Sequence, residues 1–289
     1  MHPLLHGFLH HPMAKRRPIA TAWRIFVWQI VGKKAQSRIV EFGTVSKLLV
    51  KKGMAGATGN IYYGLHEFDE MMFFLKALRS EDHFVDIGAN IGSYSVLVGK
   101  EIGCRVRSFE PNPQAFEYLQ MNVELNNIQG LCDLVCAGVG AEQDELGFSD
   151  GLDTTNHVQL EGGQTRIPII ALDDQHWPLD SVFMKIDVEG FEAFVLDGGK
   201  VLFKTGKVKA FSMELNGACC AYGLEEGAIF EKILSWGYSA HYYTADKNEL
   251  TSISKPTSTN TLFILNQAFN EIHERLLLAK PVTIHGVRW

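Results

Sequence analysis

The sequence predicts a doubly wound α/β domain with a sheet of seven strands. The first observation is the stretch from His83 to Asn112, which follows the order strand, glycine loop, helix, second strand and terminal acid. The second is the succession of short, apolar, β-branched segments and segments of helical periodicity along the rest of the chain. This pattern is typical of a mostly parallel sheet covered by helices. In such a sheet a ligand binds at the carboxyl ends of the strands, where the strand order reverses.

The loop after the first strand of that stretch is suited to a ligand that carries a nucleoside. The strand itself, His83 to Ile87, is short and apolar, as expected of a strand buried on both faces. Gly88 and Gly92 let the backbone approach a ligand, and the helix that begins at Ser93 presents N–H groups to a carboxylate or phosphate. Glu110 ends the second strand, where a carboxylate can accept hydrogen bonds from both ribose hydroxyls. The alternative is a tight βα turn with Glu110 solvated at a strand end.

The spacing of the two glycines disfavours a dinucleotide. The fingerprint G-x-G-x-x-G is absent, because Gly88-x-x-x-Gly92 places no third glycine against a pyrophosphate. A nicotinamide-dependent oxidoreductase nevertheless remains an alternative, since it would also place an acid on a ribose. A nucleoside-binding module without catalytic activity is the third class.

The remaining elements follow from periodicity and turn residues. We expect residues 1–59 to form a basic leader, a helix and a small hairpin, and residues 60–289 to form the main domain. The third strand is predicted over Leu131 to Val139, and a small antiparallel insertion separates it from the fourth strand. Further strands are predicted at 181–186, 208–213, 238–243 and 261–266, and helices at 68–78, 113–123, 191–202, 225–236 and 269–278.

The N-terminal segment is basic. Residues 1–40 contain seven Lys and Arg residues and no acid, although the whole chain has a net charge of −6. The segment Ala22 to Val31 predicts a short helix that is too small to span a bilayer. Three interpretations are open: a leader followed by a helix that packs on the domain, docking of residues 15–38 on a membrane surface, or an organellar targeting peptide. In the second interpretation, Trp23, Phe26 and Trp28 would contact the lipid.

Composition excludes several classes of protein. An apolar content of 46% is ample for a large core and excludes a disordered chain. No apolar run of roughly 18 residues is present, and the N-terminus lacks the core of a signal peptide, so we expect a cytoplasmic protein with at most peripheral membrane contact. The five cysteines form no C-x-x-C pair and are expected to be buried thiols in a reducing compartment. The acidic remainder of the chain argues against a nucleic-acid partner.

Four segments together resemble the FkbM family of S-adenosylmethionine-dependent methyltransferases, namely VDIGANIGSYSVL, SFEPNP, ALDD and KIDVEGFE. The resemblance extends from about Asn60 to Leu265, and KIDVEGFE discriminates best, since many methyltransferases share the first loop but few share that fourth strand. The resemblance implies a class I methyltransferase fold, which is Rossmann-like, and S-adenosylmethionine as the cofactor. It also implies, most often, methylation of a hydroxyl on a sugar, a glycan or a secondary metabolite.

Placed on this chain, the resemblance indicates the residues that contact the cofactor. They are Glu67, Asp86, Gly88, Ala89, Asn90, Gly92, Ser93, Glu110, Pro111, Asn112, Asp187 and Glu189. An alcohol is a weak nucleophile, so a base near the acceptor is expected. The candidates are Asp187 and Glu214 at strand ends and His157 on the insertion. Asp187 could instead complement the sulfonium charge, and Glu189 could anchor the turn before Gly190. We expect no bound metal, because no D-x-D spacing or His pair is present.

Overall fold

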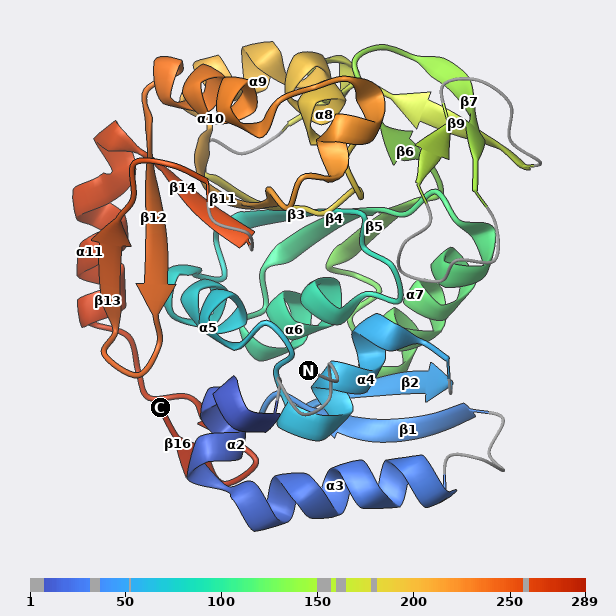
Figure 1. Cartoon of the computed structure of the whole chain (residues 1–289), viewed down its shortest axis with the longest axis vertical. Coiled ribbons are helices and arrows are strands. Elements are labelled where there is room, and N and C mark those ends of the chain that lie inside the picture. Colours follow the sequence, from blue (N-terminus) through green and yellow to red (C-terminus); the bar gives the residue numbers. More distant parts are fainter. Residues whose placement is uncertain are drawn as a thin grey trace.

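The computed structural model describes residues 8–31, 37–51, 53–149, 157–159, 165–177, 181–256 and 260–289 of the chain. Within these residues, a central sheet has eight strands in the order β13-β12-β14-β11-β10-β3-β4-β5 (Figure 1). The strands are β3 (His83–Ile87), β4 (Arg105–Phe109), β5 (Cys132–Val135), β10 (Val182–Ile186), β11 (Val208–Glu214), β12 (Tyr238–Thr244), β13 (Glu249–Ser252) and β14 (Asn260–Leu265). Neighbouring strands from β5 to β11 are parallel, whereas β14, β12 and β13 join by antiparallel pairs.

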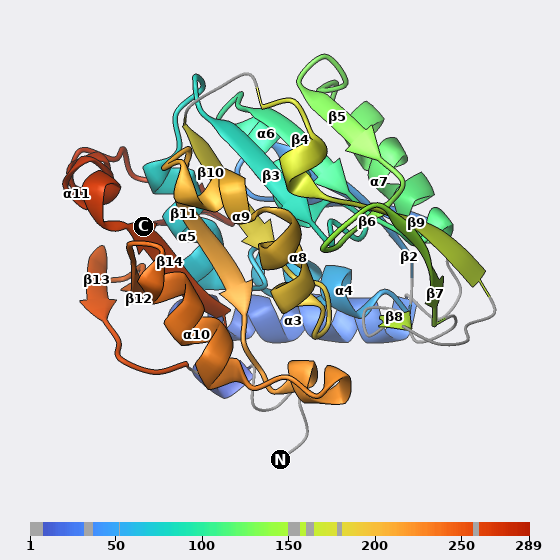
Figure 2. The same cartoon turned by 90° about the horizontal axis from the view of Figure 1, so that it is seen from above.

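The strand order confirms the doubly wound sheet. After β3, β4 and β5 the chain returns to place β10 on the other side of β3, so the order reverses between β3 and β10 (Figure 2). The sheet has one strand more than the seven predicted, because the chain turns back after β12 and adds β13 at the edge. The sequence of β13 is ELTS, which is polar and largely exposed, so it carries no apolar alternation from which a strand could be predicted.

Helices cover both faces of the sheet (Figure 1). One face carries α5 (Phe68–Ala77), α6 (Ser93–Glu101) and α7 (Pro113–Leu125), and the other carries α8 (Glu192–Gly198), α9 (Lys200–Lys204) and α10 (Glu226–Ser235), while α11 (Phe269–Leu277) packs beside α5. The helix predicted from Phe191 to Leu202 is divided into α8 and α9 at Gly199. A side chain on the preceding Gly198 would overlap the carbonyl oxygen of Gly140, so backbone packs against backbone at the end of α8.

A second sheet lies between β5 and β10 in the chain, where the insertion was predicted. Its strands are β6 (Gly138–Val139), β7 (Asp144–Phe148), β8 (Val158–Gln159) and β9 (Thr165–Ile170), in the order β6-β9-β7-β8. It is not wholly antiparallel, because β6 pairs with β9 in parallel. The predicted strand from Leu131 to Val139 is therefore split, since the chain turns at Ala137, whose N–H donates to the Val135 carbonyl at 3.0 Å. The predicted segment 153–156 of the insertion lies outside the described residues.

The N-terminal residues form a further layer against α6 and α7 (Figure 1). It consists of α2 (Pro12–Arg16), α3 (Pro18–Val31), β1 (Ser37–Phe42), β2 (Ser46–Lys51) and α4 (Ala55–Tyr63). The small hairpin predicted within residues 1–59 is formed by β1 and β2, but the helix α4 that follows it was not predicted. The side-chain amides of Asn122 and Asn126 on α7 each accept an N–H from β2 and donate to one of its carbonyls. The layer is thus bonded to the sheet domain, and the predicted division at residue 60 stays a prediction.

Helix α2 contacts the C-terminal residues of the chain. A short hairpin of β15 (Thr283–Ile284) and β16 (Val287–Arg288), which the sequence did not predict, lies near it (Figure 1). Arg16 donates to the carbonyl of Arg288 at 3.2 Å, and its guanidinium lies 3.8 Å from the centroid of the Trp289 ring. The leader is therefore folded against the C-terminus from α2 onwards.

Two cysteine side chains differ from expectation. Cys136 and Cys220 are exposed, so the five thiols are free but not all buried.

His11 is the N-cap of α2: its Nδ1 accepts the Met13 N–H at 3.1 Å, and its Nε2 lies 2.8 Å from the Leu65 carbonyl oxygen. Burial lowers the pKa of His11 to about 4. In the part of the chain that the structure describes, no helix has the length and apolar character needed to cross a membrane.

Candidate active site

A cavity of about 560 Å³ lies at the carboxyl ends of β3, β4, β10 and β11. Its wall contains all but one of the predicted site residues, namely Glu67, Asp86, Gly88, Ala89, Asn90, Ser93, Glu110, Pro111, Asn112, His157, Asp187, Glu189 and Glu214. The exception is Gly92, which has a φ of +88° and faces Leu119 of α7, where a side chain would overlap. Gly92 therefore serves the packing of α6 on α7. For all of these residues, Gly92 included, contact with a ligand stays a prediction.

The glycine loop is shaped by its contact with the loop after β10. Gly88 has a φ of +80°, which side chains rarely allow, and a Cβ there would overlap the carbonyl oxygen of Asp187. The N–H groups of Gly88 and Ala89 both donate to the Phe109 carbonyl at 3.0 Å. Gly88 therefore lets the ends of β3, β4 and β10 approach each other closely.

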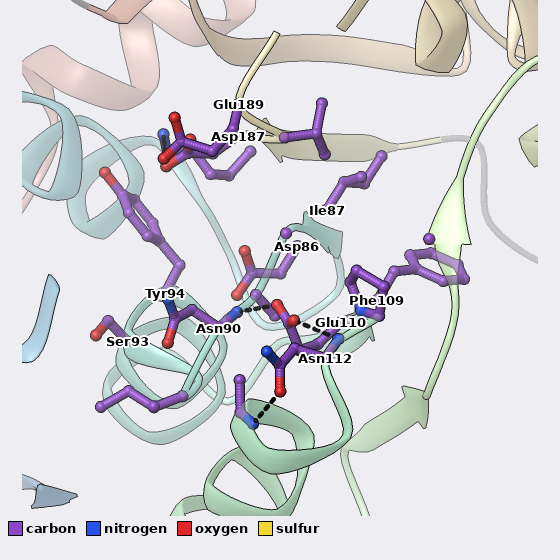
Figure 3. A pocket seen from close by; sticks show the side chains of 18 of the residues that line it. Asp86, Ile87, Asn90, Ser93, Tyr94, Phe109, Glu110, Asn112, Asp187 and Glu189 are labelled. Carbon is purple, nitrogen blue, oxygen red and sulfur yellow. Dashed lines mark hydrogen bonds and ion pairs between the residues drawn. The ribbon is translucent and has the colours of Figure 1, made fainter. Parts of the chain in front are cut away.

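Glu110 is the centre of the β4 side of the cavity (Figure 3). One carboxylate oxygen accepts the Asn90 N–H at 2.7 Å and the other accepts the Asn112 N–H at 2.8 Å. Asn112 in turn caps α7, because its Oδ1 accepts the N–H groups of Gln114 and Ala115. Burial raises the pKa of Glu110 to about 7, against the lowering effect of the two amides. Glu110 is thus not a solvated strand end but a buried carboxylate held in one orientation.

Asp86 takes a different role from Glu110. One of its carboxylate oxygens accepts both the N–H and the hydroxyl of Ser95 on α6, at 3.0 and 2.5 Å. The Ser95 hydroxyl lies 2.8 Å from that of Ser108 on β4. Burial raises the pKa of Asp86 to about 6. Asp86 therefore ties β3 to α6 at the floor of the cavity, which keeps the glycine loop in place.

Lys185 carries a buried positive charge in the middle of the sheet. Its side chain is 2% exposed, and its Nζ lies 3.3 Å from a carboxylate oxygen of Asp187, 3.7 Å from one of Glu67 and 3.9 Å from one of Glu70. The Asn260 side-chain oxygen is a further partner at 3.3 Å. Burial alone would lower the pKa of this ammonium, but the surrounding carboxylates raise it well above its usual value. Lys185 is therefore a cation in the wall of the cavity.

Glu67 and Glu70 share the charge of Lys185 unequally. The Asn260 side-chain amide donates to both carboxylates, and Tyr94 donates to Glu67 at 2.9 Å. Burial raises the pKa of Glu67, but Lys185 and these donors lower it overall. Burial and the neighbouring carboxylates raise the pKa of Glu70 to about 8. One cation cannot neutralise three carboxylates at low dielectric, so of the two glutamates Glu70 is the one whose protonated form is favoured.

The carboxylates of Asp187, Glu189 and Glu214 gather at the opposite side of the cavity from Glu110. One oxygen of each lies within 4.8 Å of the others, a spacing that a cation could bridge. Figure 3 shows Asp187 and Glu189 projecting from the end of β10. Burial and the Asp187 charge raise the pKa of Glu189 to about 7 and raise that of Glu214 as well. The cluster arises without the D-x-D spacing that was sought, and the expectation of no bound metal stays a prediction.

The insertion covers part of the cavity. Phe148 of β7, Val158 of β8 and the neighbouring His157 lie in its wall. The His157 N–H donates to the Ser149 hydroxyl at 2.8 Å, and the Tyr222 hydroxyl donates to the Val158 carbonyl at 2.6 Å. The insertion is thereby bonded to the segment after β11. His157 is close enough to the cavity to stay a candidate base.

The sequence reasoning did not identify Lys185, Glu70, Tyr94 or Asn260. Only Lys185 carried a signal, because a lysine inside the strand VFMKI, which is otherwise apolar and buried throughout, must find buried partners. Those partners are distant in sequence, since Glu67 and Glu70 lie on the far side of β3 and β4 along the chain. Their meeting depends on the strand order.

Two of three comparisons with known proteins give matches. A family model described as the methyltransferase FkbM domain matches residues 86–240. No curated protein matches the chain.

The structural matches are distant. The precorrin-6y C5,15-methyltransferase of Geobacter metallireducens is 15% identical, with 75% of this chain and 92% of that chain covered and a TM-score of 0.40. An rRNA methylase of Streptococcus thermophilus is 13% identical, with 67% and 91% covered and a TM-score of 0.37. The METTL16 methyltransferase domain is 13% identical, with 88% and 95% covered and a TM-score of 0.43. At these scores no conclusion about activity or substrate follows.

The protonation of Glu70 generates a pH prediction. The pKa of Glu70 is about 8 in the folded chain, above its usual value of 4.5. The contribution of Glu70 to the unfolding free energy is therefore complete below about pH 4.5 and is lost as the pH rises through 8. Glu70→Gln removes this titration. Between pH 5.5 and 8.5 the unfolding free energy of the variant should therefore rise relative to that of the natural chain, by at least about 1.4 kcal/mol, the equivalent of one pKa unit. Urea denaturation at the two pH values measures the difference.

The control for this experiment is Glu231→Gln on α10, where the glutamate is exposed. Its unfolding free energy relative to the natural chain should not change with pH. A pH-independent difference for Glu70→Gln would show that Glu70 is ionised at neutral pH.

Proposed function

The chain belongs to the FkbM methyltransferase family, and from that membership we propose that it transfers the methyl group of S-adenosylmethionine to a hydroxyl of a sugar, a glycan or a secondary metabolite. The observation that carries the proposal is that Glu110 and the carboxylates of Asp187, Glu189 and Glu214 face one cavity. Glu110 supports recognition of a ribose. The three carboxylates at the ends of β10 and β11 support removal of a proton from an alcohol.

The residues on the β3 and β4 side fit S-adenosylmethionine. Each oxygen of Glu110 accepts one backbone N–H, which leaves a second lone pair on each for a ribose hydroxyl. The N-cap residue of α6, Gly92, has no side chain, and Asp86 accepts the N–H of Ser95, so the N–H groups of Ser93 and Tyr94 would receive the carboxylate of the methionine end. S-adenosylmethionine bound there supplies a methyl group that is activated by its sulfonium.

The residues on the β10 and β11 side would position the acceptor. An oxygen–carbon bond forms in line with the carbon–sulfur bond that breaks, and correct placement is worth on the order of 7–11 kcal/mol. The hydroxyl proton passes to a base, which adds roughly 10²–10⁴-fold. Of the residues that carry these carboxylates, Asp187 is next to the glycine loop, since its backbone carbonyl oxygen lies against Gly88. Lys185, 3.3 Å from the Asp187 carboxylate, would hold it in place.

Glu214 and His157 are the other candidates for the base. Burial and the charge of Asp187 raise the pKa of Glu214, which brings it towards the neutral range where a general base is most effective. His157 lies on the insertion and lines the same cavity as the residues at the end of β10. We favour the carboxylates, because two of them lie together at the strand ends.

The charge of the cavity wall supports an uncharged acceptor. Asp187, Glu189 and Glu214 gather where the acceptor would enter, beside the Glu67 carboxylate in the same cavity wall. The negatively charged phosphodiester backbone of a nucleic acid would be repelled by this wall, whereas an uncharged alcohol would not. We therefore propose a small-molecule or glycan acceptor and no nucleic acid. Transfer of a tritiated methyl group to sugars and polyols as alkali-stable ethers supports this assignment, and labelling of RNA alone contradicts it.

Glu110→Ala tests the ribose contact. Loss of hydrogen bonds from two hydroxyls to a charged acceptor, reduced by water that enters the hole, should weaken binding of S-adenosylhomocysteine by roughly 2–4 kcal/mol, or about 30-fold to 1000-fold. Isothermal titration calorimetry measures the dissociation constant. Glu117→Ala, which removes an exposed carboxylate of α7, is the matched control and should bind normally. An unchanged dissociation constant for Glu110→Ala would refute the ribose contact.

Asp187→Asn and Glu214→Gln test the base. If one of these carboxylates takes the proton, its amide variant should bind S-adenosylhomocysteine almost normally. With the best acceptor from the tritium assay, its methyl transfer in single turnover should slow by at least about 10²-fold. The control is Asp174→Asn, which changes an exposed residue of the 3₁₀ helix Leu172–Asp174 before β10. Near-full rates for both amide variants would mean that catalysis is positioning alone or that His157 is the base.

A further inference from the structure

The helix α3 is fixed on the domain by one of its faces. Thr21 and Trp28 are buried on that face. Arg24 donates to the Tyr62 carbonyl of α4 at 2.8 Å, and Gln29 donates to the Tyr62 hydroxyl at 2.7 Å. Trp28 is therefore a core residue, and the expectation that it contacts lipid is wrong. These contacts hold α3 flat along the surface of the molecule, at its outer boundary (Figure 1).

The opposite face of α3 is apolar and uncovered. The exposed fractions are 86% for Ile19, 64% for Trp23, 53% for Phe26 and 53% for Ile30. Their spacing of four, three and four residues places them on one side of a helix, away from Thr21 and Trp28. The rings of Trp23 and Phe26 stack with centroids 5.7 Å apart. Four large apolar side chains in one exposed stripe indicate a surface that is covered when the protein works.

The charged residues that precede this stripe in the chain are positive. Lys15 and Arg17 are exposed just before α3, and no ion pair joins either of them to an acid among the described residues. Arg16, between them, is held by Asp246 at 2.6 Å. No acid occurs in residues 1–40, although the whole chain has a net charge of −6. The segment therefore attracts an anionic partner while the rest of the molecule repels one.

We propose that α3 docks the protein on an anionic lipid surface, with the stripe of Ile19, Trp23, Phe26 and Ile30 inserted between the headgroups and with Lys15 and Arg17 on lipid phosphates. A helix of 14 residues is too short to span a bilayer but suits an in-plane position, with aromatic residues at headgroup depth. A second copy of the chain fits less well. An isologous contact would bring like charges together, and one helix face is much smaller than a stable interface of about 800 Å² per partner.

Co-sedimentation of the full chain with vesicles tests this docking. At low salt the chain should sediment with vesicles of phosphatidylcholine and phosphatidylserine, and less with phosphatidylcholine alone. The double variant Trp23→Ser, Phe26→Ser should bind the anionic vesicles at least about 30-fold more weakly. Lys15→Ala and Arg17→Ala should each weaken binding about fivefold, and raised salt should act in the same direction.

The matched control is Leu277→Ser, Leu278→Ser, which removes two equally exposed apolar side chains at the end of α11. It should bind vesicles like the natural chain. Truncation is avoided, because His11 and Met13 pack into the fold. All variants should keep the thermal unfolding midpoint of the natural chain.

The proposal is overturned if the intact chain does not sediment at low salt, if it binds neutral vesicles equally, or if the Trp23, Phe26 variant binds unchanged. Self-association that this variant abolishes, without vesicle binding, would instead make the stripe an interface between copies.

Discussion

The buried ammonium of Lys185 is the interaction on which the arrangement of the cavity depends. It brings the carboxylates of Asp187, Glu67 and Glu70 within 3.3–3.9 Å of one nitrogen, and Asn260 of β14 joins the same group. A charge with a 2% exposed side chain is stable only if partners surround it. The ends of β10 and β14 and the beginning of α5 are therefore fixed relative to one another. The wall that the acceptor would face is built on this group.

The cavity has two sides that meet at the glycine loop. On the side of β4, Glu110 is oriented by two backbone amides, and we propose that it binds the ribose of the methyl donor. On the side of β10, the carboxylates of Asp187, Glu189 and Glu214 lie together, and we propose that the acceptor binds beside them. Gly88 joins the two, because only a residue without Cβ lets the β3 loop touch the Asp187 carbonyl. A methyl donor held on the first side would thus face the carboxylates on the second, as in-line transfer requires.

The sequence was sufficient where the signal is local. The strand, glycine loop and acid from His83 to Glu110 were predicted in their places, because buried strands and positive-φ glycines leave a pattern within a few residues. It was insufficient where the neighbours of a side chain come from distant parts of the chain. Examples are Glu70, which lies beside Lys185, and Trp28, which is buried in the core. Helix α4 was missed because its glycines, Gly56 and Gly59, are poor helix formers that only tertiary packing overrides.

The most direct test of the account is the thermal unfolding of the full chain with S-adenosylhomocysteine, NAD and NADP compared side by side. A ligand that binds the folded chain raises its stability by mass action, by roughly 2.7 kcal/mol at about 100 times its dissociation constant. The account predicts a rise of the unfolding midpoint with S-adenosylhomocysteine and none with the two dinucleotides. A rise with NAD or NADP, and none with S-adenosylhomocysteine, would contradict it.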